Sequence, residues 1–407
     1  MAESGPVGRR IRSYRRRLGL TQEVLAGRAG VSPSWLSQVE RGVRTGGLRT
    51  LLPIARELGV DLAVLVDTPR KRVPGPGGRV NGVRDLVEAL LRYPARLPDA
   101  PDTDLDSIRR QVERAEGLHR LCRFQEVGPL LARLIGDAEA AVRVHEGTER
   151  ESSAYALLAH VYRVTTLALV RAGEEQAPRW VAADRCSAAA ARADDPVAVA
   201  LAADRRATVH AHAGFVAEAR DTLMGAIDTL APVAEAAEQP AVPSPSPEPA
   251  AVWGSLLLNS ARWAARANDR ADCHRLLRQA DATVPRVRRD DDLFGPTSAA
   301  IYHVACAVEL GDLADALHLG AAIDTSHLDS VERSRPAALR VRIAEAHAMR
   351  AQDADALLWL IEAERLAPEW IRGGRVEVHD MVGAMLRRER GRRPGLRELA
   401  GRVGVLD

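Results

Sequence analysis

The 407-residue sequence has few aromatic side chains, few cysteines and almost no lysine. Aromatic residues make up 3% of the chain, and Lys71 is the one lysine among 57 basic residues, a bias that indicates a GC-rich genome and fits an actinobacterial source. Cys122, Cys186, Cys273 and Cys306 are scattered, without a CxxC or Cys/His cluster. We therefore expect buried free thiols, with neither disulfides nor a metal site.

Motifs that bind phosphates or activate nucleophiles are also missing. The sequence contains no GxxxxGK(S/T) loop, no GxGxxG after a strand, no HExxH and no GxSxG. In the HAHAG run at residues 210–214 the two histidines are at i and i+2, so they point to different sides of a helix. We predict a protein that is not an enzyme and has no cofactor.

No continuous apolar run reaches the roughly 18 residues that a membrane span requires, and the arginine-rich start lacks the apolar core of a signal peptide. We expect a cytoplasmic protein that does not contact the membrane. The chain is 46% hydrophobic and rich in alanine, which favours an all-α fold.

Residues 21–42, TQEVLAGRAGVSPSWLSQVERG, contain two short helices joined by a glycine turn. Thr21 can cap the first helix, whose apolar residues Val24, Leu25 and Ala29 fall on one face that we expect to be buried. Gly30 gives the backbone the freedom to leave that helix at a sharp angle. The spacing predicts a helix-turn-helix.

The second helix of this motif presents polar groups on its outer face. Ser32 can cap it with Pro33 at its first position, while Leu36 and Val39 point inward with the corner residue Val31. The outward positions are Ser34, Trp35, Ser37, Gln38 and Arg41. Small polar groups, an amide and a cation suit the major groove of DNA.

With these residues in place, residues 7–67 resemble the Cro and phage-repressor (XRE) type of DNA-binding domain, a five-helix, lambda-repressor-like fold. The resemblance implies that Gln22 binds a backbone phosphate and that the third helix touches base edges. The contact residues carried over are Gln22, Ser32, Ser34, Ser37 and Gln38. The resemblance also implies a pair between Arg15 and Glu40 that positions the helices, and Pro33 departs from repressors with a long polar side chain there.

Three further residues complete the predicted DNA-binding set. Trp35 either reads a base or packs on the domain surface, and Gln38 has the amide geometry for bidentate pairing with adenine. Arg41 and Arg44 leave the recognition helix where phosphates should lie, so we interpret them as backbone contacts. Residues 1–72 carry a net charge of about +8, whereas the whole chain carries +2, so the basic charge is concentrated at this end.

The rest of the chain divides into a linker and a long helical part. We predict a DNA-binding domain over residues 1–67, a flexible linker over 68–82 (TPRKRVPGPGGRVNG) and a repeat domain over 83–407. Within it, residues 239–249 (QPAVPSPSPEP) predict a disordered surface loop, with a proline-rich ligand as the alternative.

The helical part carries small residues at fixed distances from its turns. The turn residues Gly214, Asn268 and Ala351 are followed by compact residues five and twelve positions on, and Gly311 by one five positions on; these residues are Ala219, Ala226, Cys273, Ala280, Ala356, Ala363 and Ala316. Seven residues before the turns stand Ala207, Ala261, Val304 and Ala344, Pro368 follows the last unit, and Gly173 is placed to open an earlier one. These offsets resemble a degenerate tetratricopeptide (TPR) array, an α-solenoid of helix pairs, with units longer than the usual 34 residues.

In such an array the first helix of each pair lines the concave wall. The resemblance places ten polar residues there: His160, Arg163, Asp204, Thr208, Ser255, Asn259, Arg262, Ser298, Tyr302 and Glu345. They suit a peptide or a polar small-molecule effector, or else form a solvated groove that keeps the array soluble. In the stretch 294–312, Thr297 and its neighbours either cap a helix or contribute to function.

The combination of an XRE-type DNA-binding domain (the head, residues 1–67) with a repeat domain (the array, residues 83–407) resembles regulators common in actinobacteria. It also resembles, distantly, the RRNPP group of peptide-sensing regulators. The main hypothesis is a transcriptional regulator that binds a two-fold operator in double-stranded DNA as a homodimer and senses an effector. The alternative is a regulator whose array docks a partner protein without a small effector. We expect the final helices, residues 376–405, to cap the array or to pair.

Overall fold

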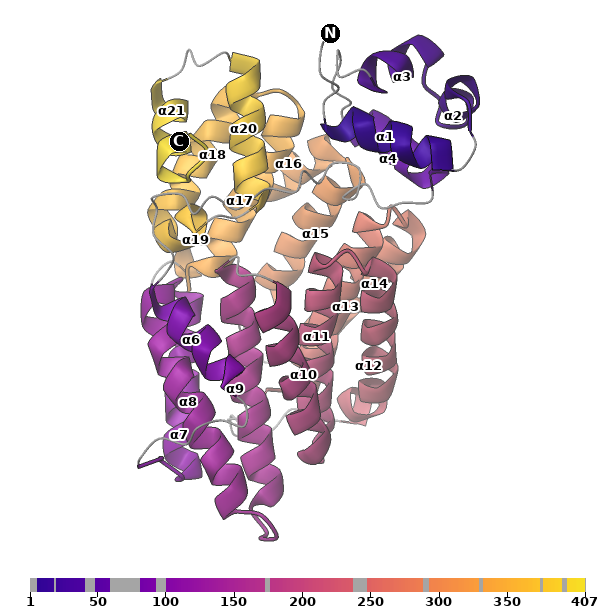
Figure 1. Ribbon diagram of the computed structural model, residues 1–407. Helices are drawn as coiled ribbons and strands as arrows, with labels where there is room; N and C mark the ends of the chain where they lie inside the picture. The colour runs from indigo at the N-terminus through magenta and orange to yellow at the C-terminus, as the bar shows by residue number, and fades with distance from the viewer. Residues whose placement is uncertain are drawn as a thin grey trace. The chain divides into compact units, whose positions relative to one another are not determined.

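The chain divides into two compact units, residues Met1–Val73 and Pro74–Asp407 (Figure 1). The computed structural model describes residues 6–17, 20–40, 48–58, 81–92, 100–172, 176–236, 247–287, 293–328, 332–373, 376–389 and 394–406. These residues are helical with short turns and contain no strand, so the predicted all-α class is confirmed.

The described part of the first unit consists of α1 (Pro6–Arg17), α2 (Gln22–Arg28), α3 (Pro33–Glu40) and α4 (Leu48–Glu57). Their apolar faces meet in one core of Ile11, Leu25, Ala26, Ala29, Leu36, Val39, Leu51, Ile54, Ala55 and Leu58. Helices α1 and α3 approach closely at Gly8, where a Cβ would collide with the carbonyl oxygen of Val39. The predicted fifth helix falls outside the described residues.

In the helix-turn-helix, the predicted helix cap and glycine turn are confirmed, whereas the predicted burial of one residue is not. The Thr21 side chain accepts a hydrogen bond from the Val24 backbone N–H at 3.2 Å, and Gly30 has a φ of +66°. However, Val24 is 41% exposed, so its prediction as a buried residue was wrong. The buried stripe of α2 passes through Leu25, Ala26 and Ala29, and Val24 lies beside it rather than on it.

The second unit is built from helices that pack in consecutive antiparallel pairs after α6 (Asn81–Leu91). The pairs are α7 (Leu105–Arg120) with α8 (Phe124–Val144), α9 (Glu151–Arg171) with α10 (Gln176–Arg192), α11 (Pro196–His212) with α12 (Val216–Ala236), α13 (Pro249–Arg266) with α14 (Arg270–Thr283), α15 (Pro296–Leu310) with α16 (Leu313–Ala321), and α17 (Ser334–Met349) with α18 (Asp353–Leu366). The chain ends with α19 (Pro368–Arg372), α20 (Val376–Glu389) and α21 (Pro394–Arg402).

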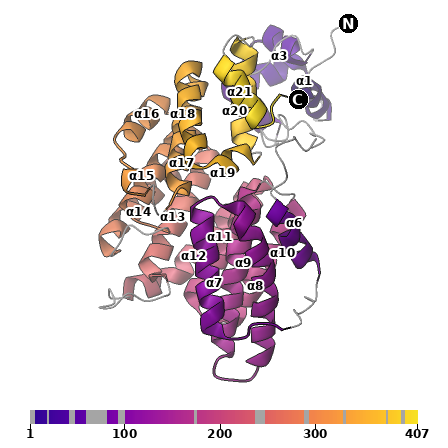
Figure 2. The same ribbon diagram turned by 90° about the vertical axis from the view of Figure 1, so that its left-hand side faces the viewer.

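The pairs stack in a regular manner. Each first helix contacts the first helix of the next pair, giving a continuous row of α7, α9, α11, α13, α15 and α17. Figure 2 shows the successive pairs side by side. Helix α6 packs on α8 and adds Val83, Leu86 and Leu90 to the core of the first pairs. This is the stacking of an α-solenoid, in which each pair buries its apolar faces against its neighbours.

The turns between paired helices agree with the sequence register. Gly214, Asn268, Gly311 and Ala351 all have a positive φ, as the sharp exit from a helix requires. The compact residues around these turns are buried, with the exception of Ala226, which is partly exposed. Gly173, predicted to open an earlier unit, lies outside the described residues. At the corresponding place between α7 and α8, Cys122 takes the left-handed conformation, with a φ of +58°.

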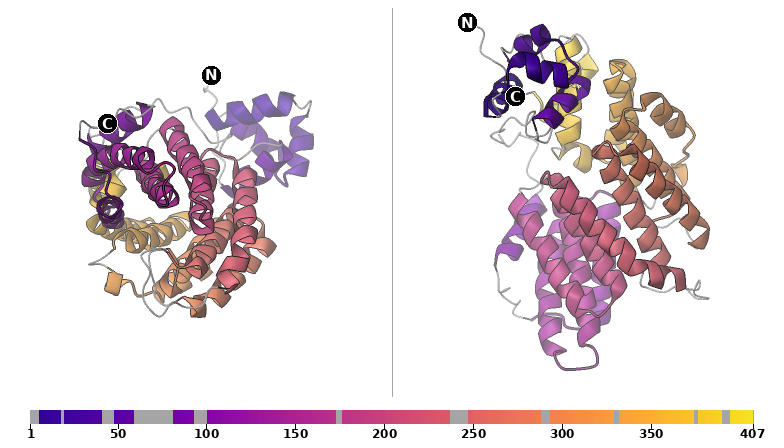
Figure 3. Two further views of the ribbon diagram at one scale, coloured as in Figure 1. Left: turned by 90° about the horizontal axis from the view of Figure 1, so that it is seen from below. Right: turned by 90° about the vertical axis from the view of Figure 1, so that its right-hand side faces the viewer.

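The array also closes on itself, which the register does not predict. Seen from below, the helices of the second unit follow one another round a ring (Figure 3). At the closure the Gln125 backbone N–H donates to the Glu369 carboxylate at 3.0 Å, and Cys122 and Phe124 join the apolar core of α17 to α21. The guanidinium of Arg171 lies 4.6 Å from the ring centroid of Trp370.

The starts of two helices, and the composition of a third helix, can be compared with the sequence predictions. Helix α6 begins at Asn81, so the last two residues assigned to the linker are helical, and α13 begins at Pro249, the last residue assigned to the loop. The remainder of both segments lies outside the described residues, apart from Pro247 and Glu248. Helix α9 is long and apolar enough to cross a membrane by length and composition, but 67% of that window is buried inside the array.

The aromatic residue that opens the stretch 294–312 is part of the core. Phe294 is fully buried, and a Cβ on Gly254 of α13 would lie 2.6 Å from its ring carbons. We expect Gly254→Ala to destabilise the array by about 1–3 kcal/mol, because the ring has no room to move away. Thermal unfolding measures this loss. Gly225→Ala on α12 is the matched control, since nothing lies within 4 Å of its added Cβ, and an equal loss in both variants would contradict the packing argument.

Candidate DNA-reading surface and inner wall of the array

A buried polar triad connects the first three helices of the head. Arg15 of α1 donates from Nε to Glu40 Oε1 at 2.6 Å and from Nη2 to Glu40 Oε2 at 2.9 Å, which is the expected pair. Gln22 of α2 donates from Nε2 to Glu40 Oε2 at 2.7 Å. The hydrogen bond with Glu40 raises the pKa of Arg15, so that cation is permanent. Glu40, which is 2% exposed, therefore fixes α1 and α2 against the end of α3.

The triad uses only part of the donor capacity of Gln22. The amide nitrogen of Gln22 carries two hydrogens, of which the bond to Glu40 uses one. Within the described residues the second hydrogen has no acceptor, and Gln22 is only partly buried. This geometry is compatible with the phosphate contact that the family resemblance implies.

Helix α3 presents its polar side away from the core. Ser32 caps it, its Oγ accepting from the Trp35 backbone N–H at 3.2 Å. Ser34 is exposed, Ser37 and Gln38 are partly exposed, and Leu36 and Val39 are buried. Trp35 is partly buried against the head core, which favours the packing interpretation of its indole. The predicted phosphate contacts Arg41 and Arg44 lie outside the described residues.

The row of first helices (α7, α9, α11, α13, α15 and α17), here named the inner row, carries the ten polar residues predicted for the concave wall. Four of them are buried: Arg163, Asp204, Asn259 and Ser298. Six are partly buried: His160, Thr208, Ser255, Arg262, Tyr302 and Glu345. The row is thus only partly open to solvent, because many of its side chains bind one another across neighbouring helices.

One chain of hydrogen bonds spans three first helices. Tyr302 of α15 donates from its hydroxyl to Asn259 Oδ1 at 2.6 Å, and Asn259 of α13 donates from Nδ2 to Asp204 Oδ1 of α11 at 3.0 Å. Asp204 also pairs with Arg205. Burial raises the pKa of the Tyr302 hydroxyl, so it remains a donor. The chain fixes the spacing of α11, α13 and α15.

Charged groups that the sequence register did not select complete the wall. Glu116 of α7 lies 2.6 Å from Arg163 and 3.2 Å from His160. Burial by itself would raise the pKa of Glu116, but the neighbouring Arg163 and His160 bring it well below the ordinary value. Arg342 of α17 binds Glu345 at 2.6 Å and lies 3.7 Å from Glu309 of α15.

A helical spacing rule would have found several of these residues. Glu309 follows Tyr302 by seven positions and Arg342 precedes Glu345 by three, so each shares a helix face with a predicted residue. Glu116 lies on α7, and no turn residue was predicted from the sequence between α7 and α8. The wall positions were found by counting back from such turns, so Glu116 was missed. These contacts show how the array can hold charged groups at its inner row without exposing them fully.

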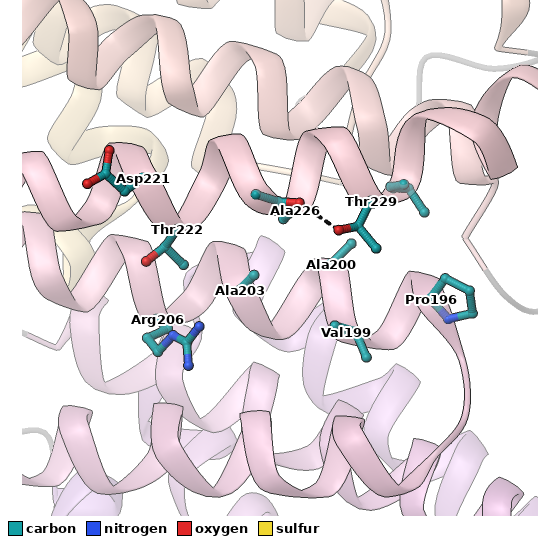
Figure 4. Close-up of a pocket in the computed structure, with 11 residues that line it drawn as sticks. Pro196, Val199, Ala200, Ala203, Arg206, Asp221, Thr222, Ala226 and Thr229 are labelled. Carbon is teal, nitrogen blue, oxygen red and sulfur yellow. Dashed lines mark hydrogen bonds between the residues drawn. The ribbon is translucent and has the colours of Figure 1, made fainter.

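An open groove of about 370 Å³ lies elsewhere, between α11 and α12 (Figure 4). The small side chains Ala200, Ala203 and Ala226 leave the space, and Arg206, Asp221 and Thr222 stand at its side. Its lining includes none of the ten predicted wall residues. The partial exposure of Ala226 follows from this groove.

A capped pair of short helices whose second member exposes serines and a glutamine defines the head as a helix-turn-helix DNA-binding domain. A family model described as a helix-turn-helix domain matches residues 6–67. The chain belongs to the helix-turn-helix transcriptional regulators of the XRE type.

The relatives share this head. The HTH-type transcriptional regulator y4dJ of Sinorhizobium fredii, itself uncharacterised, is 43% identical over 68 residues, which are 17% of this chain and 87% of that protein. The propionyl-CoA carboxylase regulator of Cereibacter sphaeroides is 36% identical over 90 residues, which are 22% of this chain. The match covers 18% of that relative's own length.

Solved structures match along most of the chain, and PlcR is an example. PlcR of Bacillus thuringiensis, in complex with the peptide PapR7 and DNA, is 13% identical, and the match covers 90% of this chain and 99% of that chain with a TM-score of 0.32.

Proposed function

We propose that this regulator binds a two-fold operator as a homodimer and that its array senses a peptide or polar small-molecule effector. The observation that carries the DNA-binding part is the Arg15–Glu40–Gln22 triad, which holds α3 with Ser34, Ser37 and Gln38 toward solvent. In this proposal Gln38 reads a base and Gln22 holds a phosphate, with Ser32, Trp35, Arg41 and Arg44 as the remaining contacts.

The sensing part is supported by the inner row of the array. The first helices from α9 to α17 carry partly exposed polar side chains, and hydrogen bonds join α11, α13 and α15. An effector that binds several first helices at once would change their relative positions and so couple to the DNA-binding affinity. Such a ligand would also stabilise the folded array by mass action.

Selection of bound fragments from random DNA by the full-length protein, followed by binding at several salt concentrations, tests the proposal. A two-fold site with half-sites about one duplex turn apart and a steep salt dependence is the expected result. Failure to enrich any sequence, with or without added peptides and metabolites, would contradict direct operator recognition.

Gln38→Ala should weaken binding to the selected operator by roughly 1–3 kcal/mol and relax the preference at one base pair, because a bidentate amide contact would be lost. Competition binding between the operator and single-base variants measures both effects. Gln22→Ala is the comparison variant, since loss of a phosphate contact weakens binding to all sequences alike. A uniform loss in the Gln38 variant would show that Gln38 does not read a base.

A further inference from the structure

Two arginines of the inner row, Arg171 and Arg262, are partly buried and have neither an ion pair nor a hydrogen bond among the residues that the structure describes. Arg163 pairs with Glu116, Arg205 with Asp204, and Arg342 with Glu309 and Glu345. In contrast, Arg171 at the end of α9 and Arg262 on α13 form no ion pair within the described ranges. Each instead lies beside a tryptophan ring.

The Arg262 side chain is held in an unfavourable place for a cation. Its Nε is buried and has no hydrogen-bond partner in the described part of the chain, and its Cζ lies 5.0 Å from the Trp263 ring centroid. Burial lowers the pKa of Arg262, and the like charge of Arg342 lowers it further. Arg262 is one helical turn beyond Asn259, so it shares the face that carries the hydrogen-bond chain.

Arg171 is in a similar position. Its guanidinium is 4.6 Å from the Trp370 ring centroid, and burial lowers its pKa. Tyr302 raises the pKa of both Arg171 and Arg262, and its hydroxyl binds Asn259, which lies one helical turn before Arg262 on α13. The acids Glu309 and Glu377 also lie near Arg262 and raise its pKa, but neither forms an ion pair with it within the described residues.

We propose that the effector carries an anionic group, a carboxylate or a phosphate, that is held by the guanidiniums of Arg171 and Arg262. This inference rests on the proposed sensing function of the array and names the chemical class of its ligand. A guanidinium presents parallel N–H donors that match either anion, and a site shielded from water strengthens such a contact. Without the ligand, a partly buried cation that has no ion pair within the described ranges, such as Arg262, costs stability.

The test is thermal unfolding of the full-length protein with three probes at matched ionic strength. The probes are a random heptapeptide pool built without Asp and Glu and with free C-terminal carboxylates, the same pool with amidated C-termini, and inorganic pyrophosphate. The variants are Arg262→Gln and Arg171→Gln, with Arg206→Gln as the control, because Arg206 is an exposed cation of α11 in the open groove.

We expect at least one anionic probe to raise the unfolding midpoint of the wild type and of Arg206→Gln, but not of the two other variants. The free pool acting alone identifies a carboxylate, and pyrophosphate acting alone identifies a phosphate. Without probes, Arg262→Gln should unfold at a higher temperature than the wild type by roughly 2–4 °C, since an uncompensated charge is removed. A residue needed only for structure would give a lower midpoint.

Two other outcomes overturn the proposal in distinguishable ways. If both peptide pools stabilise the wild type and the Arg262 and Arg171 variants equally, the array senses peptides but the anionic contact is refuted. If no probe shifts any midpoint, the anionic class is refuted, and the proposed effector sensing is then judged by whether the peptides and metabolites added in the operator-binding assay change DNA affinity.

Discussion

Glu40→Ala should abolish DNA binding by unfolding the head while the array remains intact. The carboxylate of Glu40 is 2% exposed and receives two hydrogen bonds from Arg15 and one from Gln22. Its removal leaves the Arg15 guanidinium, itself 8% exposed, without its counter-charge. Breaking a buried ion pair in this way costs about 3–5 kcal/mol, which is comparable with the whole stability of a small domain.

Hydrogen exchange of the full chain separates this effect from general destabilisation. We expect the amides of α2 and α3 to lose protection and those of α9 and α17 to keep it. Glu23→Ala is the matched control, because Glu23 is an exposed carboxylate in the first turn of α2 and its loss should change stability by no more than about 0.5 kcal/mol. Retained operator affinity in the Glu40 variant would refute the positioning role of the triad.

The triad shows which parts of the site could be predicted from the sequence. The pair of Arg15 and Glu40 followed from the family resemblance, whereas the hydrogen bond of Gln22 to the same carboxylate required three helices to meet in space. Val24 was assigned to the buried face because it fits a helical period. In a seven-residue helix, however, the neighbours decide which stripe is covered, and they cover Leu25, Ala26 and Ala29.

The array was predictable where its signals are local. A left-handed turn followed by compact residues is a pattern of nearby positions in the sequence. Gly214, Asn268 and Gly311 could therefore be predicted as turn residues from the sequence alone. The ring closure could not, because it joins Gln125 to Glu369 across 244 residues and no local pattern links them. The same holds for Arg171, which acquires its aromatic neighbour only when the ring closes.

Trp370→Ala should produce the largest loss of stability within the array. The indole is 1% exposed in the core shared by α17 to α21 with Cys122 and Phe124, so its truncation leaves a large cavity. Such a change costs about 3–5 kcal/mol, and the lost contact with Arg171 adds about 0.5–2 kcal/mol. We expect a midpoint several degrees lower and faster exchange of the α7–α8 turn and α19.

Trp180→Ala supplies the matched control for this prediction. Trp180 on α10 is only partly buried, and its ring packs beside His210 at a centroid distance of 4.8 Å, away from the closure. It should cost less and leave exchange at the α7–α8 turn unchanged, while Trp370→Phe should recover most of the lost midpoint because a ring remains under Arg171. If Trp370→Ala and Trp180→Ala loosened the α7–α8 turn equally, the closure would not depend on Trp370.

Because the closure also positions Arg171, the loss of Trp370 should weaken anion binding at the inner wall together with the stability of the ring.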